Sequence, residues 1–376
     1  MKSRRLFTCL ALSTALFLSG CGSNAAPIYK DVLVPVGVDG TQFYYQHFAQ
    51  LAQGAQYPSS LWVVDLETGV SRRLAPAEVR PYWIEVSGDY YVFPTTLQGT
   101  GNVTKSSLLA VQISTGERFT IFDELAEASF ILDGSRVAYM ADTPELVIYD
   151  LLTRAVLQRV ALPEDASGVW GFRGNRVLTT RMTLPEGTAD GSNAQVDGAD
   201  LQNTEWTFLL IDLDTQEQTE FVAGPEGWVP MPLDNALSGD WVVTSGMDAA
   251  SDGSSEAMEI VAWQISTGTG RSLAAYEPAA TSLGRPPIAF AFVSDLSDTH
   301  AAVYRMTGLT WGTELIDVQS GERTVLVNGG VDSLFGSDTA IPFLSDNAAY
   351  WIDRNERSLV VYEISSGARS TITLGF

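Results

Sequence analysis

The chain has 376 residues, with 22 Lys or Arg against 45 Asp or Glu, which gives a formal net charge of −23. This excess of acidic groups argues against a nucleic-acid-binding protein, because phosphate binding needs clustered Lys and Arg. Hydrophobic residues make up 45% of the chain, so it has the apolar material for a packed core and is not disordered throughout. The 33 Gly and 16 Pro residues indicate many turns and short strands.

The N-terminal residues have the pattern of an export signal. Lys2, Arg4 and Arg5 precede an apolar stretch, Leu6 to Leu18, that is too short to span a bilayer. The sequence Leu18-Ser19-Gly20-Cys21 resembles the lipobox of bacterial lipoproteins. We therefore expect a lipoprotein signal peptide at residues 1–20 and a tether with lipidated Cys21 at residues 21–30. The alternative is an ordinary signal peptide that ends near an unrelated cysteine.

The lipobox resemblance implies a location and a partner. Cys21 would become the first mature residue and carry acyl chains such as palmitate, so the lipid bilayer is one predicted partner. The protein would face outside the cytoplasm in a bacterial cell envelope. Gly22 is not the Asp associated with inner-membrane retention, which favours the outer membrane of a Gram-negative cell, or the cell surface of a Gram-positive one. Cys9 leaves with the signal, so no disulfide is expected.

A repeat runs through the rest of the chain. Each copy has Asp, Glu or Gln, then an aliphatic residue, any residue, Ser or Thr, and in five copies Gly. The seven copies are VVDLETG (63–69), AVQISTG (110–116), IYDLLTR (148–154), LIDLDTQ (210–216), AWQISTG (262–268), LIDVQSG (315–321) and VYEISSG (361–367). Gly in this place supplies the positive φ of a short hairpin turn. Arg154 and Gln216 replace it in two copies, where we expect looser turns or turns of another type.

A second turn precedes each hairpin and is followed by a β-rich run, as in Asp39-Gly40 before QFYYQ and Gly239-Asp240 before WVVTS. Each unit is thus predicted to form four antiparallel strands, A to D. Because a single four-stranded sheet leaves two faces exposed, seven such units are expected to stack in a ring. The predicted fold is an all-β, seven-bladed β-propeller over residues 31–376.

The two turn motifs resemble those of the TolB-like and WD40-like bacterial propeller families, over residues 31–374. This resemblance implies structure and does not identify a ligand. The fourth unit is the longest, and its extra residues, from Thr183 to Glu205, are rich in Gly, Asp and Asn. We interpret them as a loop between strands B and C.

Two histidines limit the available catalytic chemistry. Only His47 and His300 could act as the base of a Ser-His-Asp site, and no Gly-x-Ser-x-Gly motif occurs, so serine peptidase activity and a following hydrolase domain are not expected. His300 falls in an A-B turn and is interpreted as a surface residue. His47, near the end of a strand, is a candidate for a ligand-binding or catalytic role.

Two acidic loops are candidates for a metal site. Both lie between strands B and C and could supply oxygen ligands to Ca²⁺, although neither has EF-hand spacing, so solvated acidic loops are the alternative. Their acidic residues are Asp190, Asp197, Asp200, Asp248, Asp252 and Glu256. No other cofactor is expected.

Aromatic and Arg residues lie near the predicted entries to strand A, on the face built by the B-C and D-A loops. Such residues commonly anchor binding surfaces, while the alternative is that the Trp rings pack between blades. The candidates are Arg80, Tyr82, Trp83, Trp170, Trp228, Arg285 and Phe335.

These features together favour a membrane-anchored binding or scaffold module for an envelope protein, peptide or glycan. The alternative is a carbohydrate-active enzyme, a glycoside hydrolase or lyase, with paired carboxylates at the central channel.

Overall fold

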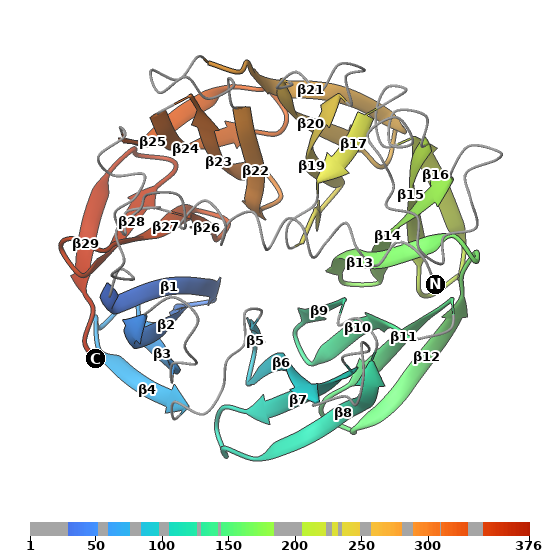
Figure 1. The fold of residues 1–376 in the computed structure, drawn as a ribbon, viewed down its shortest axis with the longest axis horizontal. Coiled ribbons are helices and arrows are strands. Elements are labelled where there is room, and N and C mark those ends of the chain that lie inside the picture. Colours follow the sequence, from blue (N-terminus) through green and yellow to red (C-terminus); the bar gives the residue numbers. More distant parts are fainter. Residues whose placement is uncertain are drawn as a thin grey trace, which may run out of the picture.

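A computed structural model describes residues 29–51, 59–75, 84–97, 105–125, 129–141, 144–183, 205–222, 228–231, 235–248, 257–279, 289–308, 310–329 and 341–376. In these ranges the chain forms only strands and turns, and no helix could cross a membrane. The seven sheets are arranged around a ring (Figure 1). The predicted all-β, seven-bladed fold is confirmed. Residues 1–28, including Cys21, lie outside the described ranges.

In six blades, four consecutive strands pair antiparallel with their neighbours in the chain, and in the fifth blade strand A consists of two pieces that both pair with strand B. The strands, blade by blade, are β1 (Tyr29–Asp39), β2 (Gln42–Leu51), β3 (Ser59–Asp65) and β4 (Ser71–Ala75); β5 (Glu85–Ser87), β6 (Tyr90–Leu97), β7 (Lys105–Gln112) and β8 (Arg118–Leu125); β9 (Phe130–Asp133), β10 (Arg136–Met140), β11 (Glu145–Asp150) and β12 (Ala155–Ala161); β13 (Ala166–Arg173), β14 (Arg176–Thr183), β15 (Glu205–Asp212) and β16 (Gln218–Val222); β17 (Trp228–Met231), β18 (Leu237–Ser238), β19 (Trp241–Asp248), β20 (Met258–Gln264) and β21 (Thr269–Tyr276); β22 (Ala289–Leu296), β23 (His300–Thr307), β24 (Thr310–Asp317) and β25 (Arg323–Gly329); β26 (Phe343–Leu344), β27 (Ala348–Asp353), β28 (Ser358–Glu363) and β29 (Arg369–Thr373).

The blade faces are buried because successive side chains of a strand point to opposite sides of its sheet. In β6, Tyr90 and Val92 pack against the third blade, whereas Tyr91 and Phe93 pack against the first. An apolar cluster of this kind fills each of the seven junctions between neighbouring blades. Strands B and C are therefore nearly continuous apolar runs, while outer strands such as β12 are largely exposed.

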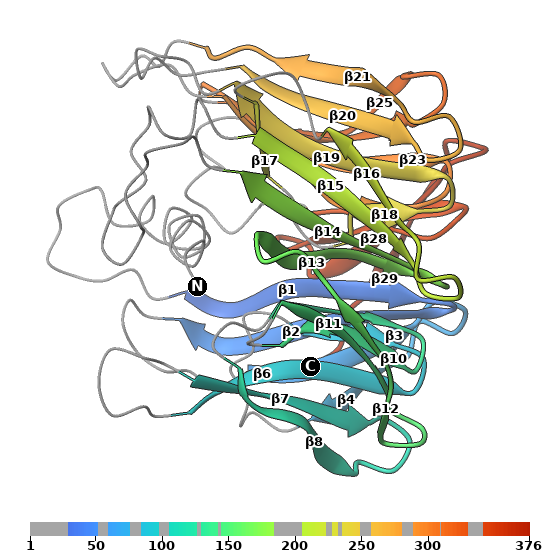
Figure 2. The same ribbon diagram turned by 90° about the vertical axis from the view of Figure 1, so that its right-hand side faces the viewer.

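The A-B and C-D turns lie together on one face of the ring, on the right in Figure 2. All seven predicted A-B turns lie at the places where strand A meets strand B. On this face a side chain of one blade binds the turn of the next: Ser87 Oγ accepts a hydrogen bond from Gly134 N at 2.9 Å, and Asp133 Oδ2 accepts one from Gly174 N at 2.8 Å. These bonds fix the angle between blades.

The C-D turns share one hydrogen-bond pattern. In the first blade, Asp65 Oδ1 accepts from the backbone N–H and the hydroxyl of Thr68, each at 2.8 Å. The expectation of different turns at Arg154 and Gln216 is wrong, since both residues adopt positive φ angles, 54° and 59°, like the glycines of the other copies. Thr153 and Thr215 donate the same bonds to Asp150 and Asp212, and these bonds hold the turn despite the steric cost of a side chain at positive φ.

Two blades have Gln where the others have Asp or Glu at the end of strand C. In the second blade, Asp89 of the A-B turn accepts a bond from Gln112 Nε2 at 2.9 Å and one from Ser114 N at 2.8 Å. In the fifth, Asp240 binds Gln264 and Ser266 in the same way. In these two blades the carboxylate that accepts hydrogen bonds from the C-D turn belongs to the A-B turn rather than to strand C.

Candidate functional site

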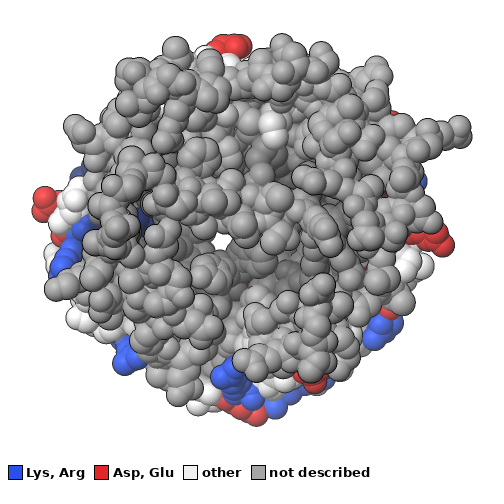
Figure 3. Space-filling model, in the orientation of Figure 1, with Lys and Arg blue, Asp and Glu red and all other residues white. Residues whose placement is uncertain are grey.

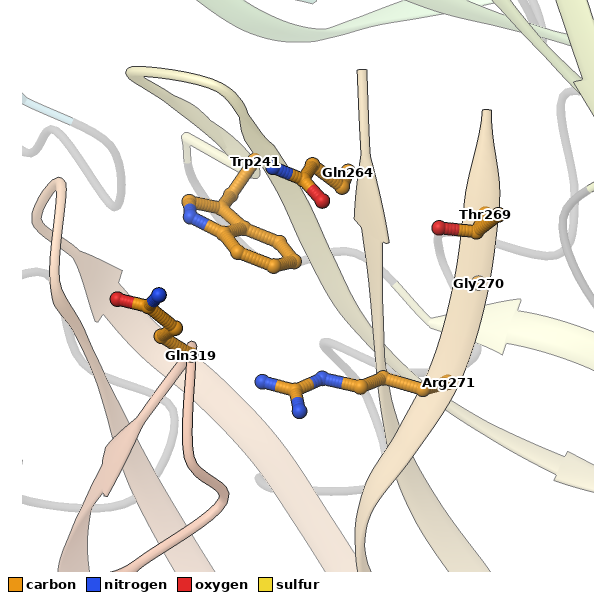
Figure 4. Close-up of a pocket in the computed structure, with 6 residues that line it drawn as sticks. All are labelled: Trp241, Gln264, Thr269, Gly270, Arg271 and Gln319. Carbon is orange, nitrogen blue, oxygen red and sulfur yellow. The ribbon is translucent and has the colours of Figure 1, made fainter. Parts of the chain in front are cut away.

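A cavity of about 330 Å³ opens on the turn face between the fifth and sixth blades. This volume is at the lower end of the ~300–1,000 Å³ typical of small-ligand sites. Its lining residues are Trp241, Gln264, Thr269, Gly270, Arg271 and Gln319. Their side chains converge on one space from strands β19, β20 and β21 and from the C-D turn of the sixth blade (Figure 4).

Trp241 and Arg271 form the centre of this cavity. The guanidinium carbon of Arg271 lies 5.6 Å from the centroid of the Trp241 ring, within cation–π range. One guanidinium nitrogen also donates a hydrogen bond to the backbone carbonyl of Val318 in the sixth blade. Both side chains are half-buried. Arg271 therefore bridges two blades while its guanidinium faces the cavity (Figure 4).

Hydrogen bonds in the adjoining C-D turn fix the polar wall. Gln264 donates through Nε2 to Asp240 Oδ2 at 3.0 Å, and the hydroxyls of Thr267 and Thr269 lie 2.7 Å apart. Burial alone would raise the pKa of Asp240, but hydrogen bonds from Ser266 and Gln264 outweigh it and lower this pKa. Asp240 is thus ionised and holds the Gln264 amide in one orientation.

Gly270 is required by packing. A Cβ atom built on it would lie 2.5 Å from Nε1 of Trp263, which lies against this part of the strand. Any side chain at position 270 would displace that indole from the core between the fourth and fifth blades. The local backbone that carries Thr269 and Arg271 therefore depends on a glycine between them.

Arg271 is unusual among the half-buried cations of this acidic chain. Arg181 pairs with Asp165 and Glu220, and Arg305 pairs with Glu314. Within the described ranges, Arg271 forms no ion pair. A half-buried guanidinium without a counter-charge is costly, so this position favours an anionic ligand.

Glu314 forms a second charged cluster, at the outer part of the same blade junction. Its carboxylate is 2% exposed, pairs with Arg305 and Arg323 and accepts a 3.1 Å bond from the Tyr276 hydroxyl. Burial, followed by the negative charge of Glu314, raises the pKa of Tyr276. Through these bonds Glu314 of the sixth blade joins Tyr276 of the fifth blade to two arginines of its own blade.

The sequence-predicted aromatic and Arg residues have different outcomes. Trp170 and Trp228 are 3% and 4% exposed and pack in the cluster between the fourth and fifth blades. They are interior residues, as the alternative proposed, so an exposed anchoring role is corrected for these two. The reason is that both rings meet Trp206, Phe208 or Trp263 edge-on or tilted inside the junction. Arg80, Tyr82, Trp83, Arg285 and Phe335 lie outside the described residues.

The two histidines contact structural neighbours. The ring of His47 stacks 4.3 Å from the ring of Phe376. His300 begins β23 beside the A-B turn and is partly exposed: its Nδ1 lies 2.9 Å from Thr299 Oγ1, and its Nε2 lies 4.0 Å from Asp317. Burial lowers the pKa of His300, against the opposing effect of Asp317.

The predicted acidic metal ligands are not placed. Asp190, Asp197, Asp200, Asp252 and Glu256 lie outside the described ranges, as does the side chain of Asp248. In the part of the chain that the structure describes, no three His, Cys, Asp or Glu side chains gather into a metal-binding group. Strands β14 and β15 of the fourth blade pair with each other, and residues 184–204 of the loop expected between them lie outside the described ranges.

None of the cavity residues was predicted as a site. A signal was present in the repeat: Trp241 occupies the first position of strand B, where other blades have Gln42, Tyr90, Arg136, Arg176, His300 or Ala348. The sequence does not reveal that Arg271, 30 residues later, faces this ring from strand D.

No family model matches the chain, and no curated protein matches it in sequence. Among solved structures, the β-propeller domain of the Trilobed protease from Pyrococcus furiosus is similar with a TM-score of 0.52 and 10% identity, covering 93% of this chain and 99% of that one. The Pyrococcus horikoshii acylaminoacyl peptidase gives a TM-score of 0.52 and 16% identity, covering 78% and 45%. The chain spans less than half of that peptidase.

At these identities the similarity shows the fold alone. The chain is a seven-bladed β-propeller. The two similar structures are a protease β-propeller domain and a peptidase.

Proposed function

We propose that this propeller is a lipid-anchored module of a bacterial cell envelope that binds a protein, peptide or glycan outside the cytoplasm. The anchor rests on the sequence Leu18-Ser19-Gly20-Cys21. Strand β1 begins at Tyr29, eight positions after Cys21, and an extended chain of that length reaches on the order of 30 Å. The propeller would therefore be held close to the membrane surface.

The observation that best supports a binding role is the Trp241–Arg271 cavity. Its lining offers an aromatic ring, a cation, two carboxamides and a hydroxyl, groups that recognise a ligand rather than transfer its protons. The charged side chains of the described residues visible in Figure 3 lie around the rim of the ring. A rigid ring of mutually packed blades suits a module that presents such surfaces.

Membrane fractionation tests the anchor. Cys21→Ala is expected to move the protein from the membrane fraction to the soluble fraction, whereas the matched variant Cys9→Ala, inside the predicted signal, should leave it in the membrane. Continued sedimentation of Cys21→Ala with membranes would overturn the anchor.

Crosslinking of the full-length protein in its native envelope tests the binding role. We expect an envelope protein or glycan to be captured. An empty crosslinking result together with turnover of a glycan panel would instead support a carbohydrate-active enzyme.

A further inference from the structure

We infer that the Trp241–Arg271 cavity binds a single acidic sugar residue, such as a hexuronate, with its carboxylate on Arg271 and its ring against Trp241. This inference rests on the proposed binding function and names a ligand class and a site for it. The cavity lies on the turn face at the junction of the fifth and sixth blades.

The carboxylate is inferred from Arg271. A guanidinium has five N–H donors and matches a carboxylate in a two-point geometry. In the described structure, Arg271 makes one hydrogen bond, to the neutral carbonyl of Val318. It is the one charged residue among those that line the cavity. A ligand carboxylate would supply the counter-charge that Asp and Glu side chains supply to Arg181, Arg305 and Arg323.

The sugar ring is inferred from the other walls. Trp241 offers an indole that can pack against the C–H face of a pyranose ring, because aromatic rings contribute large contact areas. Gln319 and Thr269 add hydrogen-bonding groups for ring hydroxyls (Figure 4). An apolar amino-acid side chain would leave these polar groups unpaired in the bound state, which is unfavourable. The lining therefore favours a sugar over an apolar side chain.

The size of the cavity limits the ligand. A volume of about 330 Å³ is near the lower bound of ~300 Å³ for ligand sites. The walls come from two blades that the Arg271–Val318 bond joins. One sugar residue fits this space, and a longer glycan would extend from it across the exposed turn face.

A direct binding experiment tests the inference. The full-length protein in detergent is titrated with glucuronate and galacturonate, and with glucose and galactose as neutral counterparts, by saturation-transfer NMR or calorimetry. We expect a uronate to bind about tenfold more tightly than its neutral hexose, the size of effect that one charge-assisted hydrogen-bond pair gives.

Variants assign the binding to this cavity. Arg271→Ala should abolish the preference for uronate, and Trp241→Ala should weaken binding of both sugars about tenfold or more. The matched control is Arg369→Ala, which also removes a cation–π contact with a Trp and a hydrogen bond to a neighbouring blade, at Trp351 and Leu326, but does not line the cavity. It should bind like the wild type.

Three results would overturn the inference: equal affinity for uronate and hexose, uronate binding that Arg271→Ala leaves unchanged, or equal binding of N-acetyl-glycine, which has a carboxylate and no sugar ring. If a folded wild-type protein binds no uronate yet still crosslinks to an envelope partner, the acidic-sugar site is wrong and the binding function stands. Near-ultraviolet circular dichroism of each variant shows whether it is folded.

Discussion

Tyr45 of the first blade donates a hydrogen bond from its hydroxyl to the backbone carbonyl of Gly375, at 2.7 Å and across 330 positions of sequence. Gly375 N in turn donates to Ser71 Oγ at 3.1 Å, and Phe376 stacks on His47. These contacts, with the cluster of Phe43, Tyr350 and their neighbours, join the seventh blade to the first. No strand of the described sheets is shared between the two blades, so within the described residues each of these closing contacts involves a side chain.

Removing the Tyr45 hydroxyl should weaken this closure. Tyr45→Phe leaves the Gly375 carbonyl without its donor, and we expect it to lower the free energy of unfolding by about 1–3 kcal/mol. Urea denaturation measures the change.

The control for this prediction is Tyr44→Phe, which removes a hydroxyl bond to Gln42 inside the first blade. It should cost about 1 kcal/mol or less, because its partner is close to solvent. Equal losses in the two variants would show that the Tyr45 bond has no special part in closure.

The exchange of Asp and Gln between blades predicts an energetic coupling. Gln112→Asp would remove the Gln112 Nε2 bond to Asp89 Oδ2 and add a second carboxylate near Asp89, and it should cost about 1–2 kcal/mol. Asp89→Asn alone loses the charged acceptor of Ser114. Combined, the two changes reproduce the Asn175 and Asp212 pair of the fourth blade.

We therefore expect the double variant to be more stable than the sum of the single losses by about 0.5 kcal/mol or more, measured by urea denaturation as a double-mutant cycle. If the stability losses of the two single variants simply add up in the double variant, the view that a carboxylate at either position can bond the C-D turn is contradicted.

Gln216 and Arg154 both have positive φ angles, but we expect their replacement by glycine to change the stability of the protein differently. Gln216→Gly should stabilise the protein by about 0.5–1 kcal/mol, because glycine has no Cβ to strain this conformation. Arg154→Gly gains the same relief but loses the ion pair with Glu117 and the contact with the Phe119 ring at 4.5 Å, so we expect no net gain. Melting temperatures compare the two, and a fall for Gln216→Gly would reject the explanation.

The turn aspartates predict a loss of stability in acid. Burial would raise the pKa of Asp150, but hydrogen bonds from Thr153, Leu152 and Ser135 outweigh it and hold this pKa below its ordinary value of 3.8. Because the unfolded chain then binds the proton more readily, the stabilisation is complete above that value and is lost as the pH falls through the lower, folded pKa.

Asp150→Asn tests this sign. At neutral pH the variant should be less stable than the wild type by about 1–2 kcal/mol, and the difference should shrink as the pH falls below 3.8, where the carboxylate takes up its proton first in the unfolded wild-type chain. Glu67→Gln, which changes net charge equally on an exposed turn residue, controls for general charge effects. A difference that stays constant with pH would sink the prediction.

The sequence predicts the fold well because each repeat indicates it in two ways, through its turn residues and through the β-rich runs between the turns. Every A-B and C-D turn falls where the motif places it, since Gly40 or Asp65 acts through bonds to near neighbours in the chain. The cavity could not be predicted from the sequence in the same way. Trp241 and Arg271 meet through strand pairing, and Val318 approaches from the next blade.

Two predictions failed for an identifiable physical reason. Trp is a residue type that commonly anchors binding surfaces, but its large aromatic area also suits the core between two blades, where Trp170 and Trp228 are buried. Arg154 and Gln216 lack the glycine that the motif favours, yet the neighbouring aspartate bonds fix the backbone there. Residue type alone does not decide between such outcomes when the packing partner is distant in sequence.

Closure by side chains also sets how the ring would respond to force. At six junctions the polypeptide itself connects one sheet to the next, but the first and seventh sheets have no such link. At that junction no connecting segment of the described chain limits how far the two sheets can separate, whereas no junction is held by a shared strand ladder. Under tension the ring would open first between the first and seventh blades, and the Tyr45–Gly375 contact would be among the first to break.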